Sequence, residues 1–336
     1  MVISGGEARL TLDRGLTREL RREGVEVAGI GDATARGRRI TLPVLAGATN
    51  GAAGRGALTV GGGFSFESSA NRARVGDILI NTGKGQSTAR IAGTHRILAR
   101  HGPLRTAPAG FGTRIRITDL TLTAGTAAAL NRKLRLPGVF RPGRRLGSLA
   151  VVAIPESVQI EYGKIAIGGP ETTFSKLESI GVQMGIWGAS ERWAAPGETY
   201  FLFPFESASV APDASAGILE GEAGDGVSME IHSPPPRNML LRAPRIDLAS
   251  GDLSATVSAL SADDPGQAAT IATLDYGAAN FQIRPRVGAF ELMGIRAVAS
   301  QFIADQLNQR FATPSLFQAG ETLARISVTL HAPAAD

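Results

Sequence analysis

Hydrophobic and polar residues alternate along much of this chain, with the period of two that is typical of half-buried β-strands. In the segment 114–122, Ile115 and Ile117 share one face, and after a shift near Thr118 the buried positions continue at Leu120 and Leu122. Similar segments are 78–80, 146–154, 253–260 and 323–330. The pattern predicts a mainly β, antiparallel fold, and the shift predicts a β-bulge near Thr118.

Each half of the chain also contains two segments with helical features. The short ones, 16–23 and 173–180, are each followed by a glycine (Gly24 and Gly181), which readily ends a helix. A longer helix is predicted over 124–136, between a Thr123 N-cap and Pro137. Its counterpart is predicted over about 294–311, where an apolar stripe at helical spacing indicates packing on a sheet: Ile295, Val298, Ala299, Phe302, Ile303 and Leu307.

Four short matches between the two halves occur in the same order. The pairs are 20–27 with 177–184, 39–44 with 200–205, 129–132 with 306–309, and 140–143 with 317–320. The turn segments 81–85 and 249–252 occupy matching places and predict equivalent hairpins. The matches predict two tandem homologous domains, 1–155 and 156–336, each an antiparallel β-sandwich with two short helices. Because little sequence separates them, we expect a rigid pair.

Composition narrows the possible chemistry. The 336 residues include no cysteine, which excludes disulfides, thiol nucleophiles and cysteine-based metal sites. No apolar run approaches the roughly 18–20 residues of a transmembrane helix, so no transmembrane segment is expected. The first ten residues lack the features of a signal peptide. A cytoplasmic protein and an exported one whose signal has been removed both agree with this.

The residues that could carry chemistry do not assemble into a recognised catalytic motif. No two of the four histidines have the i, i+3 or i, i+4 spacing of a helical metal site, and we expect no metal at His95, His101, His232 or His331. The glycines around Lys84 lack the spacing of a phosphate-binding loop and predict a hairpin turn. Since no nucleophile, base and oxyanion donor come together, a non-enzymatic protein is predicted.

Other polar and aromatic residues are interpreted as structural. The adjacent acids Asp263 and Asp264 lie in a segment typical of a turn. The tyrosines Tyr162, Tyr200 and Tyr276 are interpreted as strand residues. An exposed pair formed by Trp187 and Trp193 could stack on a sugar, but we expect both to be buried over the end of the domain.

Three stretches of the first half resemble the haem-transport-associated (HtaA-type) domains of bacterial envelope proteins. They are 35–47, 54–66 and 120–151, and the resemblance extends more faintly over 164–332. It implies β-sandwich domains exported to the envelope, and haem bound through a tyrosine in the first helical region. The corresponding stretches 16–20 and 173–177 contain neither Tyr nor His, so no haem ligand is assigned. We therefore expect no cofactor, with haem as the alternative that the resemblance implies.

Charge divides the chain sharply. Residues 1–155 carry 24 Lys and Arg against 9 Asp and Glu, a net charge of +15, and residues 156–336 carry 11 against 21, a net charge of −10. Basic clusters include 18–22, 36–39 and a candidate assembly surface formed by Arg132, Lys133, Arg135, Arg141, Arg144 and Arg145. Three explanations are open: ordinary solvated surface, attraction between basic and acidic units, or an anionic partner such as an envelope polyanion. Nucleic acid is not expected, because no aromatic residues for base stacking accompany the arginines.

These observations favour a non-enzymatic structural or assembly protein of the cell envelope or exterior. Head-to-tail contact between basic and acidic units would produce a homo-oligomer, possible forms being a filament or a surface layer. The alternative is a carrier or binding protein for haem or another apolar small molecule. Neither the ligand nor the symmetry of an assembly follows from the sequence.

Overall fold

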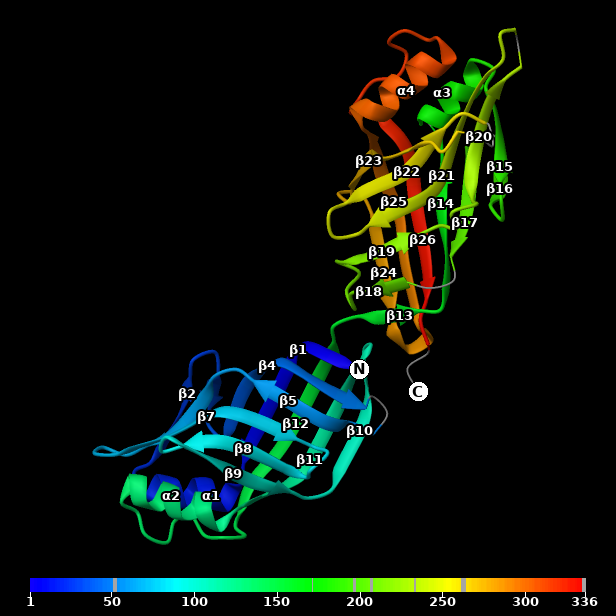
Figure 1. Ribbon diagram of the computed structural model, residues 1–336. Helices are drawn as coiled ribbons and strands as arrows, with labels where there is room; N and C mark the ends of the chain where they lie inside the picture. Colours follow the sequence, from blue (N-terminus) through cyan, green and yellow to red (C-terminus); the bar gives the residue numbers. More distant parts are fainter. Residues whose placement is uncertain are drawn as a thin grey trace. The chain divides into compact units, whose positions relative to one another are not determined.

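The computed structural model describes residues 1–50, 53–170, 172–195, 198–205, 208–232, 234–260 and 264–333. The chain divides into two compact units, Met1–Glu156 and Ser157–Ala335. Both are built mainly of antiparallel strands, and each has two short α-helices, which lie together at one end of its strands (Figure 1). The mainly β fold class predicted from the alternating pattern is confirmed.

In its described residues, the first unit contains a twelve-stranded sheet and two α-helices. The helices are α1 (Arg14–Arg22) and α2 (Ala124–Leu134). The strands are β1 (Val2–Leu12), β2 (Glu26–Ile30), β3 (Thr34–Arg36), β4 (Arg39–Asn50), β5 (Arg55–Val60), β6 (Gly63–Glu67), β7 (Arg72–Asn81), β8 (Gln86–Ile91), β9 (Thr94–His101), β10 (Leu104–Ala109), β11 (Gly112–Leu122) and β12 (Arg145–Pro155).

The strands of the first unit close on themselves. Hydrogen-bonded neighbours follow the order β4, β1, β12, β11, β9, β8 and β7, and β5 joins β7 back to β4. The sequence predicted a β-sandwich of two packed layers. In the structure, the strands of the two layers are joined into one closed sheet. β3 pairs with β4, β10 pairs with β11, and β2 pairs with β6, so these shorter strands extend the ring at its edges.

The described part of the second unit contains a fourteen-stranded sheet, two α-helices and one short 3₁₀ helix. The helices are α3 (Thr173–Ser179), α4 (Gln301–Phe311) and η1 (Pro285–Val287). The strands are β13 (Val158–Ile160), β14 (Tyr162–Gly168), β15 (Gln183–Trp187), β16 (Glu191–Ala195), β17 (Glu198–Phe205), β18 (Ala208–Val210), β19 (Gly217–Glu220), β20 (Gly226–Ile231), β21 (Arg237–Asp247), β22 (Asp252–Ser258), β23 (Gln267–Asp275), β24 (Asn280–Arg284), β25 (Ala289–Ala299) and β26 (Thr322–His331).

The central strands of the second unit pair in the same order as those of the first. β17, β14, β26, β25, β23, β22 and β21 are successive neighbours, as are β4, β1, β12, β11, β9, β8 and β7. The closing step differs, because β18 pairs with β13 and β19, and within the described residues it does not pair with β17. The second unit is therefore open where the first is closed.

Irregularities recur at corresponding places in the two units. The register between β11 and β12 shifts between Ile117 and Leu120, which confirms the predicted bulge. The register between β25 and β26 shifts in the same way between Leu292 and Ile295. The predicted hairpins are also present, since short turns join β7 to β8 and β21 to β22.

The longer helices are anchored by the same asparagine contact. In α2, the Asn131 side chain donates to the Phe140 carbonyl at 2.7 Å and accepts from the Phe140 N–H at 2.9 Å. In α4, Asn308 forms the same pair of bonds with Phe317, at 2.7 and 3.1 Å. Each asparagine side chain thus satisfies both the N–H and the carbonyl of a phenylalanine in the loop after the helix. These two hydrogen bonds fix the loop against the helix.

The helix predicted from residue 294 begins later in the structure. Residues 294–299 belong to β25, where Ile295 pairs with Ile326, and α4 starts only after the N-cap Ser300. The apolar stripe was therefore half strand and half helix, because a short apolar run fits either period. The strand conformation of residues 294–299 depends on pairing with β26, about 30 residues later in the chain.

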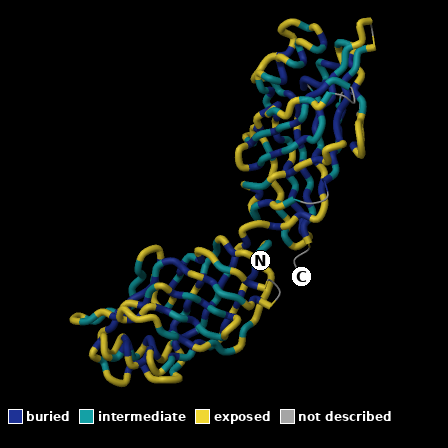
Figure 2. The backbone as a smooth tube through the Cα atoms, in the orientation of Figure 1, coloured by how far each residue is buried: buried dark blue, intermediate teal, exposed yellow. Residues whose placement is uncertain are grey.

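Burial is concentrated in the middle of each unit (Figure 2). In the first unit Phe66 contacts Phe64 and Phe140 edge-on, with ring centroids 5.6 and 5.1 Å apart. These contacts pack the loop after α2 against β6. Leu130 in α2 and Leu307 in α4 are fully buried, with 0% and 1% of their surface exposed.

We predict that Leu130→Ala and Leu307→Ala each destabilise the protein by about 2–5 kcal/mol, because each removes buried methyl groups and leaves a cavity. Chemical denaturation measures the loss. The matched controls are the exposed helix positions Lys133→Ala and Gln309→Ala, for which we expect changes within about 0.5 kcal/mol. A loss below about 1 kcal/mol for both leucine variants would contradict helix packing on the sheet.

Candidate functional site

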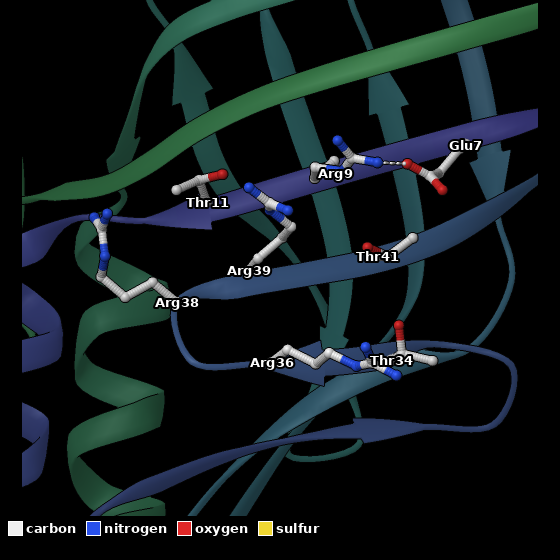
Figure 3. Close-up of a pocket in the computed structure, with 8 residues that line it drawn as sticks. All are labelled: Glu7, Arg9, Thr11, Thr34, Arg36, Arg38, Arg39 and Thr41. Carbon is white, nitrogen blue, oxygen red and sulfur yellow. Dashed lines mark hydrogen bonds and ion pairs between the residues drawn. The ribbon is translucent and has the colours of Figure 1, made fainter.

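A concave, arginine-rich pocket of about 470 Å³ lies on the outer face of the first unit. It forms where β1, β3 and β4 run side by side (Figure 3). Its lining is polar throughout and consists of Glu7, Arg9, Thr11, Thr34, Arg36, Arg38, Arg39 and Thr41.

Strand alternation explains why these residues meet. On β1, Leu10 and Leu12 point into the core, so Arg9 and Thr11 point outward. Thr11 lies opposite Arg39 on β4, and Arg39 lies opposite Arg36 on β3. Residues directly opposite each other in an antiparallel pair project from the same face, so the three strands supply one surface.

The pocket carries an excess of positive charge. Arg9 forms an ion pair with Glu7 at 2.5 Å, and the Arg38 guanidinium donates to the Leu12 carbonyl at 3.1 Å. Within the described residues, Arg36 and Arg39 form no ion pair, and Glu7 is the one carboxylate in the lining. Such an arrangement can hold an anion, since guanidinium groups bind carboxylates and phosphates through paired N–H donors.

The corresponding strands of the second unit carry aromatic residues instead. Trp193 on β16 lies opposite Tyr200 on β17, Tyr200 lies opposite Gly168 on β14, and Gly168 lies opposite Arg325 on β26. We call Trp193, Tyr200 and Arg325, with the glycines between them, the aromatic ledge. The Trp193 and Tyr200 rings are tilted by 42°, with centroids 5.7 Å apart, and Trp193 is 51% exposed.

Two glycines allow close packing within the ledge. A Cβ on Gly169 would lie 3.1 Å from the Tyr200 hydroxyl and 3.3 Å from the Arg325 Cβ, so these two side chains pack directly over the buried Gly169. A Cβ on Gly168 would clash with the Thr199 carbonyl at 1.9 Å. Partial burial and the nearby Glu198 raise the pKa of the Tyr200 hydroxyl, and Arg325 acts in the opposite direction. Within the described residues, Arg325 forms no ion pair.

The tryptophans are not buried, so that expectation was wrong. Trp187 is 47% exposed on β15, and Trp193 is exposed on β16. Both strands are edges, because among the described residues each pairs on one side only. The two tryptophans lie on different strand pairs, and only Trp193 is part of the aromatic ledge. Sequence analysis missed the ledge because Tyr200 and Arg325 are 125 positions apart and meet only through β14.

The other histidines and tyrosines have different surroundings. His101 is partly buried, its Nε2 lies 2.8 Å from the Ser87 hydroxyl, and desolvation lowers its pKa to about 4. The Tyr162 and His331 rings stack with centroids 4.6 Å apart, and Tyr162 is 57% exposed. Burial raises the pKa of Tyr276. Among the described residues, no three His, Asp or Glu side chains come together as a potential metal site.

The candidate assembly surface lies at the helical end of the first unit, and part of its charge is neutralised there. Arg144 forms an ion pair with Glu19 at 2.5 Å, and Arg145 forms one with Asp119 at 2.8 Å. Arg132 and Lys133 are exposed in the last turn of α2, and Arg135 caps it. Arg141 donates to the Gly138 carbonyl. Head-to-tail self-association through these residues stays a prediction.

Other residues singled out in the sequence have structural positions. Lys84 lies in the β7–β8 hairpin turn, where its N–H donates to the Asn81 side chain at 2.8 Å. The Asp264 carboxylate accepts from the Ala259 and Gly266 N–H groups, at 2.5 and 2.9 Å, and Asp263 lies outside the described residues. None of the helices in the described part of the chain is long and apolar enough to span a membrane.

No family model matches this chain, and no curated protein matches it. Solved structures that match include two domains of HtaA and the heme binding protein HtaB, all from Corynebacterium glutamicum. The C-terminal HtaA domain is 18% identical with a TM-score of 0.37, and the match covers 52% of this chain and 98% of that one. HtaB and the N-terminal HtaA domain are each 12% identical with TM-scores of 0.34, and both matches cover 52% of this chain, with 95% and 99% of theirs.

The surroundings of His101 predict a pH dependence of stability. Its pKa falls from 6.5 to about 4 on folding, so below pH 6.5 the unfolded chain binds a proton that the folded chain does not. Stability should therefore decline as the pH falls from about 6.5 to about 4. In denaturant titrations across this range, His101→Gln should show a smaller decline than the parent chain. Exposed His232→Gln is the control, and equal declines in all three proteins would contradict the assignment.

Proposed function

We propose that this chain is a non-enzymatic binding protein that carries a flat, apolar small molecule with at least one carboxylate. The observation that carries the proposal is the aromatic ledge, where an exposed tryptophan and a tyrosine face an arginine without an ion pair. The function as a carrier is the alternative that we drew from the sequence. It replaces assembly as the main proposal, since two of the six predicted assembly residues are already paired within their own unit.

The chemistry of the ledge explains the choice of ligand. A flat ring system can stack on the exposed Trp193 ring, and aromatic pairs of this kind contribute about 0.5–1.5 kcal/mol beyond the area they bury. Arg325 can bind a carboxylate through two parallel hydrogen bonds. The apolar cavity in the core of the second unit measures only about 20 Å³, which is too small for such a ligand.

Haem, the ligand that the sequence resemblance implies, has the properties expected of the proposed ligand. It is flat and apolar, and its two propionate groups are carboxylates. Tyr200 supplies the type of oxygen donor that binds haem iron in some proteins. Its raised pKa opposes the phenolate form that such a bond requires, while Arg325 favours it. Tyr200 and Arg325 lie close to each other across Gly169, so a ligand bound on the ledge can reach both side chains.

An envelope or extracellular location belongs to the same proposal. It rests on the resemblance of the segments 35–47, 54–66 and 120–151 to HtaA-type domains. A carrier at the cell surface needs an accessible site, and the ledge residues Trp193 and Arg325 are exposed.

Titration of the full chain with haemin and with metal-free protoporphyrin IX tests the proposal. We expect saturation at one molecule per chain for both, followed by absorbance and by quenching of tryptophan fluorescence. Trp193→Ala should weaken both by about tenfold, since a lost stacking contact of about 1.4 kcal/mol corresponds to that factor. Tyr200→Phe should weaken haemin and leave protoporphyrin unchanged, because only haemin contains iron.

Trp187→Ala is the matched control, because Trp187 is equally exposed but lies on a different strand pair. We expect it to bind both ligands as the parent chain does. Equal weakening by Trp187→Ala and Trp193→Ala, or no saturable binding by the parent chain, would overturn the ledge as the site.

A further inference from the structure

The outer face of the first unit carries more arginines than the pocket of Figure 3 contains. Arg9 on β1 lies opposite Ala150 on β12, and Ala150 lies opposite Arg116 on β11. Arg116 in turn lies opposite Arg105 on β10. Since opposite residues project from one face, a row of side chains crosses four strands and continues the pocket along the sheet.

Most of these arginines lack an acidic partner. The six strands β3, β4, β1, β12, β11 and β10 contain two acidic residues, and each is occupied: Glu7 pairs with Arg9, and Asp119 pairs with Arg145. Among the described residues, the other five arginines of these strands form no ion pair, and all five are exposed. We call this set the arginine face: Arg36, Arg39, Arg105, Arg114 and Arg116.

Two pairs within the arginine face lie directly opposite each other. Arg36 faces Arg39, and Arg105 faces Arg116. Like charges in opposite positions destabilise a sheet, so these four residues reduce the stability of the free protein. A bound anion removes the repulsion, and residues that cost stability are typical of functional surfaces.

The second unit shows that the fold does not require these charges. Its corresponding strands place Ala166 opposite Ser327, and Met293 opposite Asn280, where the first unit has Arg9, Ala150, Arg116 and Arg105. Two of the charges nearby are paired, since Lys164 binds Glu191 at 3.3 Å and Arg284 binds Glu291. The arginine face is therefore a property of this surface and not of the strand arrangement.

We propose that the arginine face binds a linear phosphate polymer, and that it does so independently of the aromatic ledge. Neighbouring strands are about 4.8 Å apart, so Arg39 on β4 and Arg116 on β11, three strands apart, are separated by about 14 Å across the sheet. That distance exceeds the reach of a single phosphate and matches a chain of anions lying across the strands. Arginine is suited to this role because its guanidinium binds phosphate oxygens in pairs.

The surface does not favour nucleic acid. The six strands contain no Phe, Tyr or Trp, so unpaired bases have no ring on which to stack. No helix lies among the arginines to enter the major groove of a duplex. The remaining interaction is with backbone charge alone, which a simple polyphosphate provides.

Binding of the full chain to inorganic polyphosphate of about 45 units, measured by titration calorimetry over a range of salt concentrations, tests the proposal. Each phosphate neutralised on a flexible strand contributes about −0.7 to the slope of log K against log salt, so five contacts predict a slope of about −3.5. The double variant Arg105→Gln/Arg116→Gln should reduce the slope by about 1.4 and weaken binding at least about tenfold. Its melting temperature should be equal or higher, because a like-charge pair is removed.

The matched control is Arg132→Gln/Lys133→Gln, which removes the same charge from exposed positions at the end of α2. We expect it to bind polyphosphate as the parent chain does. Equal weakening by both double variants would show that net charge alone binds the polymer, and would overturn the proposal. Absence of binding at low salt, or tighter binding of duplex DNA at equal phosphate concentration, would also overturn it. Haemin titration of the Arg105→Gln/Arg116→Gln variant should be unchanged, which separates this surface from the aromatic ledge.

Discussion

Pairing between the first and last long strands holds each unit together. β1 pairs with β12 from Gly5–Ile154 to Leu12–Gly147, and β14 pairs with β26 over its whole length. The paired residues of these strands are 135 to 169 positions apart in the chain, so their register forms only when the intervening strands are in place. The same register decides which residues face outward together, and both candidate sites depend on it. A shift by one residue would turn Arg9 and Thr11 into the core and Leu10 outward.

The two units use one position of a shared strand arrangement for different chemistry. Arg39 on β4 and Tyr200 on β17 occupy corresponding places, each beside the first long strand of its unit and near the helical end. In the first unit the neighbours are arginines, and the surface attracts anions by charge. In the second unit the neighbours are Trp193 and Arg325, and the surface combines an apolar plane with one cation. Since these side chains face outward, they can differ between the two units without altering the core.

Much of the fold was predictable from the sequence, because it depends on local patterns. The alternation around Thr118 predicted both the strand and its bulge, and Thr123 and Pro137 closely bracketed α2. The start of α4 was not predictable, since Ile295 fits a helical stripe and is a strand residue only because Ile326 lies beside it. The candidate sites were even harder to predict from the sequence. Arg36 and Arg39 are visible as a cluster, but Arg116 joins them only through Ala150 on β12, and Tyr200 meets Arg325 only through Gly168.

Net charge alone would have directed attention to the wrong arginines. The +15 of residues 1–155 is spread over the whole unit, and its densest sequence cluster contains Arg144 and Arg145, which are both neutralised by nearby carboxylates. Exposed ion pairs contribute little to stability, about 0–1 kcal/mol, but they remove a guanidinium from the set available to a ligand. What remains free is decided by strand register, which places Arg105 against Arg116 with no acid between them. The anion binding that we propose therefore depends on where charges are left unpaired, and the arginine face supplies five such arginines on β3, β4, β10 and β11.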